Sequence, residues 1–211
     1  DIKRSGKADS AGANGSELGQ PEIKTIVELA HDPMPVVEER ALLRSTRRDI
    51  QEIMKQISGN RFNQVTVILC SPWYFSQTRI ITIDRNERFI VDRNLIDKLL
   101  EDEKATFLNR AASQFSIAEG DEPELLEMSI MRVFLNGYET DSFINKSVKH
   151  MQLSIYISMS MKSLVSEIGS VAGEIFGAKK ITVHSSPYVL FRSAGSVLEI
   201  GNAGAVIADI G

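Results

Sequence analysis

The segment 151–159 constrains the fold of this chain more than any other. Its odd positions are apolar and its even positions are polar: Met151, Leu153, Ile155, Ile157 and Met159 alternate with Gln152, Ser154, Tyr156 and Ser158. Successive side chains of a strand point to opposite faces, so this period of two predicts a β-strand. It also predicts a sheet with one face covered by other elements and one face in contact with water.

A flexible leader, a helix and several strands are predicted before residue 86. Residues 1–20 are rich in Gly, Ser and Ala and are typical of a flexible leader. A strand at 23–27 and a helix at 37–57 follow. The uninterrupted apolar run at 65–70 predicts a strand buried on both faces, which Ser71-Pro72 ends. A further strand is predicted at 78–83, with the polar residues 84–87 as its turn.

The next block reads as strand, helix and two strands. Residues 89–91 predict a short strand, and Asp92 is placed to cap a helix that continues to about Ala111. Residues 118–123 predict a loop. The strand that follows, at 127–136, is broken by Asn136-Gly137-Tyr138, and the alternating strand 151–159 completes the block.

The last part of the chain returns to alternating helix and strand. Ser160 is expected to cap an amphipathic helix that Gly177 ends; its apolar stripe consists of Leu164, Ile168, Val171, Ala172 and Ile175. A strand at 180–183, a helix after Pro187 and a strand at 206–209 follow. The predicted class is therefore α/β, with a small α+β unit inserted at 86–159 between two sections at 21–85 and 160–211.

Composition excludes several kinds of protein. A net charge of −4 argues against bulk electrostatic attraction to nucleic acid or anionic lipid. A single cysteine allows no internal disulfide framework, and the three histidines lie too far apart in sequence to suggest a zinc site. No apolar run has the length of a membrane span, so we expect a cytoplasmic protein.

The residues at the end of the sequence suggest a nucleotide site. An apolar strand that ends in Asp209-Ile210-Gly211 places a carboxylate and a tight turn where a phosphate or its metal ion can bind. Asp209 would act on Mg²⁺ through the nucleotide, and Gly211 would let backbone amides approach the anion. The alternative is an ordinary strand end. Because the turn has no far side, we expect the chain to be a fragment cut within this site.

Four segments carry a family resemblance: 89–96, 129–140, 151–158 and Asp209-Ile210-Gly211 with the alanine before it. In this order they resemble the actin-like ATPases of the bacterial cell-division protein FtsA, and the related PilM of type IV pilus assembly. The resemblance implies a partial actin-like (ribonuclease H-like) subdomain with an inserted strand–helix–strand–strand subdomain. It also implies ATP and Mg²⁺ as cofactors of the intact protein, with none expected for this fragment.

The resemblance implies a function as well. FtsA-like proteins polymerise and link FtsZ filaments to the inner face of the cell membrane, through a C-terminal segment that these residues do not include. A PilM-like adaptor that binds a peptide of an inner-membrane pilus protein is the alternative, and a phosphotransferase is a third. The intact protein would be at most a weak ATPase, and the fragment is not expected to catalyse a reaction.

Several residues have two possible roles. Gln152, Ser154, Tyr156 and Ser158 would contact another protomer or a peptide if their strand lies at a sheet edge; otherwise they form a solvated face. Trp73 and Tyr74 either stack on a partner or pack the junction between the two units. Ser185 and Ser186 either orient a phosphate or cap a helix. The remaining candidates have a structural role as the first expectation: His184, for which no carboxylate stands at a suitable spacing, and Leu125, Met128, Met131 and Phe134.

Overall fold

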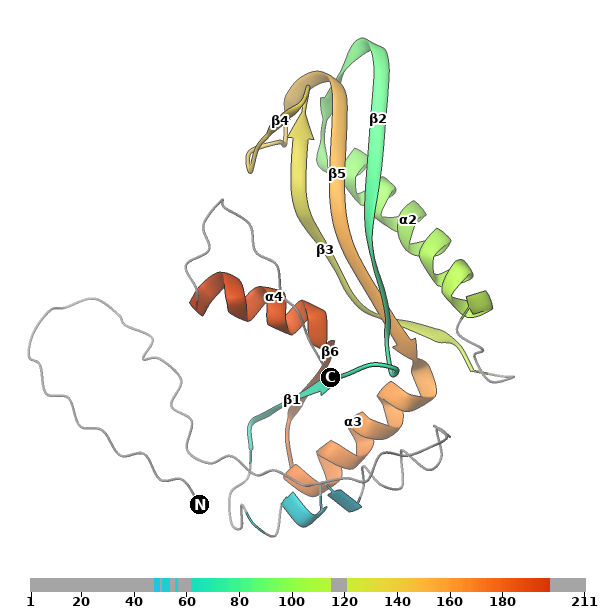
Figure 1. The fold of residues 1–211 in the computed structure, drawn as a ribbon, viewed down its shortest axis with the longest axis vertical. Coiled ribbons are helices and arrows are strands. Elements are labelled where there is room, and N and C mark those ends of the chain that lie inside the picture. Colours follow the sequence, from blue (N-terminus) through green and yellow to red (C-terminus); the bar gives the residue numbers. More distant parts are fainter. Residues whose placement is uncertain (1–47, 50, 54–55, 57–61, 115–120, 198–211) are drawn as a thin grey trace, which may run out of the picture.

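The computed structural model describes residues 48–49, 51–53, 56, 62–114 and 121–197 (Figure 1). Four predictions fall outside these residues: the leader at 1–20, the strand at 23–27, most of the helix at 37–57, and the strand at 206–209 with Asp209 and Gly211. Residues 48–49, 51–53 and 56, which belong to the predicted helix at 37–57, are helical.

Two strands that are far apart in sequence form a parallel pair. β1 (Gln64–Leu69) pairs with β6 (Lys180–Ser185) in a continuous register from Gln64↔Lys180 to Leu69↔Ser185. The prediction that β1 is buried on both faces is wrong, because its side chains alternate and Ile68 is 47% exposed. Among the described residues β6 is its one strand partner, and its covered face packs on α3 (Lys162–Phe176).

The residues between β1 and α3 build a second, antiparallel sheet. Its strands are β2 (Phe75–Val91), β3 (Pro123–Leu135), β4 (Tyr138–Glu139) and β5 (Lys146–Met161), in the order β2-β5-β3-β4. α2 (Arg93–Gln114) joins β2 to β3. The predicted succession of strand, helix and strands is therefore present, and the class is mixed α/β. By its pairing, the stretch 75–85 belongs to this sheet, although the sequence grouped it with the section before.

The sheet bends sharply at one end. Asp84 pairs with His150 and Phe89 pairs with Val148, so β2 uses more residues than β5 over this stretch. Extra residues in one strand increase its bend, and Figure 1 shows β2 and β5 curving over together at this end. The prediction of a turn at 84–87 is wrong, since the strand β2 continues through these residues. The bend returns Phe89 and Val91 to the core.

α2 covers one face of the antiparallel sheet (Figure 1). The apolar residues of β5 are fully buried beneath it, as the alternating pattern predicts: Met151, Leu153, Ile155, Ile157 and Met159. Phe107 of α2 stacks on Phe75 of β2 with ring centroids 5.5 Å apart. The predicted cap of α2 is also confirmed, because Asp92 Oδ1 accepts a hydrogen bond of 2.8 Å from the Leu95 amide.

α3 connects β5 to β6 and packs as its apolar stripe predicts. Leu164, Ile168, Val171 and Ala172 are buried, and Gly177 ends the helix with a φ of 63°, a conformation that glycine adopts at no steric cost. Leu164 and Ile168 form a core cluster with Leu69 of β1, against which Trp73 and Tyr74 pack. Of the two roles considered for Trp73 and Tyr74, the structure shows packing at the junction between the sheets.

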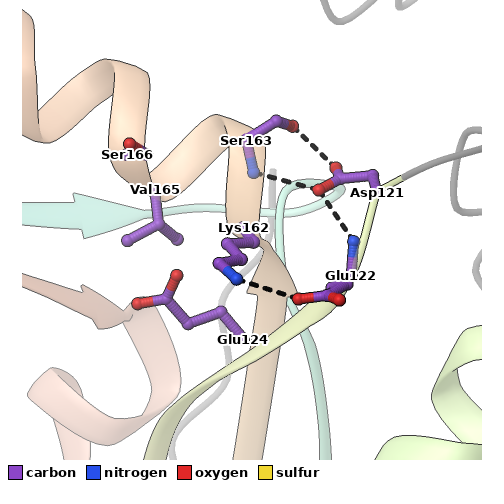
Figure 2. A pocket seen from close by; sticks show the side chains of 7 residues that line it. All are labelled: Asp121, Glu122, Glu124, Lys162, Ser163, Val165 and Ser166. Atoms are coloured by element: carbon purple, nitrogen blue, oxygen red, sulfur yellow. Dashed lines mark hydrogen bonds and ion pairs between the residues drawn. The ribbon is translucent and has the colours of Figure 1, made fainter.

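A distant aspartate caps α3. The prediction that Ser160 does so is wrong, because Ser160 is fully buried and its hydroxyl donates to the Trp73 carbonyl at 2.6 Å. Instead, Asp121 Oδ1 accepts from the Ser163 amide at 3.1 Å and Oδ2 accepts from the Ser163 hydroxyl at 2.6 Å (Figure 2). Lys162 beside it donates to Glu122 at 2.8 Å. The segment before β3 is thus joined to the start of α3.

The Asp121 cap gives the stability of the fold a pH dependence. Burial would raise the pKa of Asp121, but hydrogen bonds from the Ser163 side chain and two backbone amides, with the nearby Lys162 charge, hold its pKa below the ordinary value. A pKa lower in the folded than in the unfolded chain stabilises the fold above the unfolded value, about 4, and this contribution disappears as pH falls through the folded value.

Asp121→Ala is therefore expected to lower the free energy of unfolding by about 1 kcal/mol at pH 7, the usual effect of losing an N-cap. The loss should shrink as the pH falls below the ordinary Asp pKa. Urea denaturation at pH 7 and at a pH below the ordinary Asp pKa measures the loss of stability, and Asp141→Ala, at an exposed position, is the control. An equal loss at both pH values would contradict the role of the charged cap.

Candidate functional site

In the part of the chain that the structure describes, the face of the antiparallel sheet opposite α2 is uncovered over most of its length. We call this surface the open face; it includes Thr78 and Ile80 of β2, Gln152 and Ser154 of β5, and Arg132 of β3. Gln152, Ser154 and Tyr156 are partly exposed, as predicted, but Ser158 is fully buried. The cause is the junction with β6, which covers this end of the face.

A partner strand cannot pair with the backbone of β5. The contact role of Gln152, Ser154, Tyr156 and Ser158 was tied to a strand at a sheet edge, whereas β5 pairs with β2 on one side and with β3 on the other. Backbone pairing with a partner would have to use another strand. The side chains of Gln152 and Ser154 remain accessible on the open face, and their role as protein contacts stays a prediction.

A groove lies between the open face and α4 (Ser186–Val197). It has a volume of about 480 Å³, and α4 presents Leu190 and Phe191 beside it, 42% and 52% exposed. Side chains of the sheet and of α4 line it: Tyr74, Thr78, Met131, Arg132, Ser154, Tyr156, Ser186, Pro187, Tyr188, Leu190 and Phe191. Its lining is largely aromatic and aliphatic with a few polar groups, a composition common in binding sites.

Residues of β3 that the sequence grouped together separate in the structure. Leu125 and Met128 pack against the core around Phe107, as expected. The register of β3 shifts between Ile130 and Arg132, and Met131, which falls in this shift, lines the groove. A bulge of this kind redirects a side chain, which the sequence pattern does not show.

A buried carboxylate lies at the junction of the two sheets. Glu127 of β3 accepts hydrogen bonds at Oε1 from the Ser185 amide, at 2.9 Å, and from His184 Nδ1, at 3.0 Å. At Oε2 it accepts from the Ser185 hydroxyl, at 2.8 Å, and from the Ser158 hydroxyl. We call these four residues the Glu127 cluster. It joins β3 and β5 of one sheet to β6 of the other.

Tyr156 extends the cluster toward the groove. Its hydroxyl lies 2.9 Å from Ser185 Oγ, and it must be the donor because the single Ser185 hydroxyl proton is given to Glu127. Burial raises the pKa of Tyr156, and the Glu127 charge acts in the same direction. The Tyr156 ring stacks on Tyr188 of α4, which also stacks on His184. The groove wall is therefore tied to the cluster by rings and hydrogen bonds.

The carboxylate that orients His184 is present but comes from another strand. The sequence offered none at a suitable spacing, whereas Glu127 lies 57 residues earlier and reaches Nδ1 at 3.0 Å. Because a carboxylate only accepts, this contact places a proton on Nδ1. An imidazole held in this way can act as a general base when its second nitrogen faces a hydroxyl.

The hydroxyls nearest to Glu127 do not complete a catalytic set. A nucleophile would donate to the imidazole, yet Ser158 and Ser185 both donate to the carboxylate itself. The same contacts decide the role of Ser185, because its amide and hydroxyl already bind an anionic group and are not available for a phosphate. Ser186 donates to Tyr74 at 3.5 Å. The arrangement is that of a structural junction.

A second hollow lies at the start of α3 (Figure 2). Asp121, Glu124, Lys162 and Ser166 are among the residues that line it. The Asp121 carboxylate already receives the Ser163 amide and hydroxyl, and Lys162 points to Glu122. A helix N-terminus attracts anions, and here a side chain of the protein takes that place.

Two further properties bear on cofactors and membranes. Within 62–114 and 121–197, and the few helical residues before them, no group of His, Cys, Asp or Glu is placed to hold a metal ion. Asp209 and Gly211 lie outside the described residues, so the predicted Mg²⁺ and phosphate contacts stay predictions. None of the helices described here is long and apolar enough to cross a membrane.

Comparison with known proteins does not identify a family. No protein-family model matches the chain, and no curated protein is significantly similar to it in sequence.

Glu127→Ala is expected to lower the free energy of unfolding by about 3 kcal/mol, because it leaves the buried donors of Ser158 and Ser185, and the partly buried His184 Nδ1, without their acceptor. Chemical denaturation measures the effect. Glu139→Ala removes an exposed carboxylate 3.7 Å from Arg132 and should change stability by less than about 0.5 kcal/mol. Similar effects of the two substitutions would rule out the cluster as the main polar link between the sheets.

Proposed function

We propose that this chain is part of an FtsA-like protein of the actin superfamily, which polymerises and links FtsZ filaments to the inner face of the cell membrane in bacterial division. One observation carries the proposal: a four-stranded sheet with the succession strand, helix and three strands, the second of these only two residues long, is inserted between two strands, β1 and β6, that pair in parallel with each other. The FtsA-like resemblance implies an inserted strand–helix–strand–strand unit, followed by a helix and a strand that return to the first section of the chain. The α3 helix that leads from the inserted sheet into β6 also has its expected place.

In this proposal the two parts of the chain have different tasks. The β1–β6 pair belongs to the nucleotide-binding half, where Asp209 and Gly211 would act on ATP and Mg²⁺ in the intact protein. The antiparallel sheet contacts other proteins through its open face, including Gln152 and Ser154. The two serines of the Glu127 cluster donate to the carboxylate rather than to His184, so in this proposal the cluster has a structural role.

The proposal predicts that the 211-residue chain binds a peptide of the FtsZ C-terminal tail. Fluorescence polarisation with the labelled peptide measures the affinity, with a scrambled peptide as reference. Ser154→Arg, in the middle of the open face, should weaken binding at least tenfold because a long charged side chain fills the contact surface. Asp97→Arg, on the exposed side of α2, is the matched control and should bind as the unmodified chain does.

Equal binding of both variants would exclude the open face as the contact, and failure of the chain to bind the tail peptide would contradict the proposal. Circular dichroism of each variant checks that the fold is retained. ATP turnover that a small hydroxyl compound stimulates would favour a phosphotransferase instead. That function needs an aspartate facing a substrate, whereas Asp84 and Asp97 are exposed and neither lines the groove.

A PilM-like adaptor is the second candidate, and the groove favours it. The exposed Leu190 and Phe191 beside an aromatic wall would suit apolar side chains of a short peptide. In this case the N-terminal peptide of an inner-membrane pilus protein should bind, and the FtsZ tail should not. Phe191→Ala is expected to weaken pilus-peptide binding about tenfold, since aromatic anchors carry much of the energy of such contacts.

Ile90→Ala provides the control for that experiment. Ile90 is similarly exposed, at 62%, but lies on the bent end of β2 away from the groove. Isothermal titration calorimetry of both variants separates a specific loss from a general one. If Ile90→Ala weakens binding as much as Phe191→Ala does, the groove is not the peptide site.

A further inference from the structure

The strand β2 forms one long edge of the antiparallel sheet. β2 is the end strand in the order β2-β5-β3-β4, and β5 is its one strand partner among the described residues. An edge strand presents a row of N–H and C=O groups that can pair with another strand. Proteins usually protect such an edge with charged side chains, prolines or bulges.

The first part of β2 carries little of this protection. Arg79 is the only charged residue between Phe75 and Ile83, and its Nε donates to Glu103 Oε1 of α2 at 2.6 Å, so its charge is already paired. The charged residues of the strand come later, from Asp84 to Arg88, where the register shifts. The unprotected stretch therefore ends where the sheet begins to bend.

The side chains of this stretch are symmetric about Ile80. On the open face, Ile80 is 65% exposed and lies between Thr78 and Thr82, both exposed. In an antiparallel pair centred on Ile80, the two copies of Ile80 face each other and each Thr78 faces Thr82 of the other copy. Aliphatic and Thr–Thr pairs of this kind stabilise strand pairing. A pair centred on Arg79 would instead place two like charges opposite each other.

We propose that two copies of this chain associate through β2, in an antiparallel strand pair centred on Ile80. The contact joins two four-stranded sheets into one continuous sheet and buries the most exposed aliphatic side chain of the strand stretch. Such an interface is isologous, so it closes after two copies, whereas filament growth needs a head-to-tail contact. The inference thus goes beyond the proposed function and does not depend on the FtsA-like assignment.

Cross-linking tests the register directly. Residues directly opposite in an antiparallel pair have Cα atoms about 4.5–5.5 Å apart, within the range of a disulfide. In a Cys70→Ser background, which removes the exposed native cysteine, Ile80→Cys should form disulfide-linked dimers on mild oxidation. Ile90→Cys, 62% exposed on the same strand, does not face itself in this register and should form at least fivefold fewer.

Equal yields at both positions, or no dimer from Ile80→Cys, would overturn the proposed pairing. Sedimentation equilibrium of the chain with its native residues provides the second measurement and should show association that stops at two copies. Ile80→Lys should weaken this association at least tenfold, while Ile90→Lys should leave it unchanged. Both side chains are exposed, so the melting temperature of the monomer should be retained.

A chain that stays monomeric at every concentration, or an Ile80→Lys chain that dimerises as before, would also overturn the inference. These outcomes are distinct from those that test the proposed function. A dimer that does not bind the FtsZ tail supports the strand pair and contradicts the family-based proposal. A monomer that binds the tail supports the family-based proposal and contradicts the strand pair.

Discussion

The position of the two sheets relative to each other depends on one buried carboxylate. Glu127 is the point where β3 meets β6, and its two oxygens receive hydrogen bonds from Ser158, His184 and Ser185. Removing a carboxylate from water is costly, and only close donors offset this cost. The donors come from two strands that belong to different sheets, so the carboxylate is satisfied in one arrangement of the sheets. The apolar cluster of Leu69, Leu164 and Ile168 nearby has no comparable directionality.

The shape of the groove follows from this junction. One wall is the open face of the antiparallel sheet and the other is α4, which begins directly after Ser185. Tyr156 belongs to the first wall and Tyr188 to the second, and the two rings stack while Tyr156 also donates to Ser185. Any rotation of β6 against β3 would separate these rings. The groove wall formed by Tyr156 and Tyr188 is therefore tied to the Glu127 cluster.

The elements that the sequence predicts well are those set by local pattern. The alternation of β5, the apolar stripe of α3 and the glycine that ends it require no knowledge of distant residues. Local sequence pattern does not predict features that depend on residues far away in the chain. Ser160 looks like a helix cap, but Asp121, 42 residues before Ser163, takes that role. Residues 84–87 look like a turn, but the pairing with β5 continues beyond them.

The candidate site was least predictable for the same reason. Glu127 sits in a strand among apolar residues, and nothing in its local sequence connects it with His184, 57 residues later. The parallel pairing of β1 with β6 determines where His184 lies, and the pairing of β3 with β5 determines where Glu127 lies. Only the packing of the two sheets brings them together. A glutamate among the apolar residues of a strand is a signal that a hydrogen-bond partner exists, but the sequence does not say which residue it is.

The two exposed surfaces of the antiparallel sheet differ in what they can recognise. The open face offers side chains, so its specificity depends on residues such as Ser154 and Arg132 and on the neighbouring α4. The edge of β2 offers backbone groups, which pair with any extended strand, and its specificity must come from side-chain register. The bulge after Asp84 limits that register because the strand bends away from a straight partner beyond it. One sheet can therefore carry two separate contacts. The bend restricts strand pairing to the straight part of β2, and the groove beside α4 remains accessible to a partner of the open face.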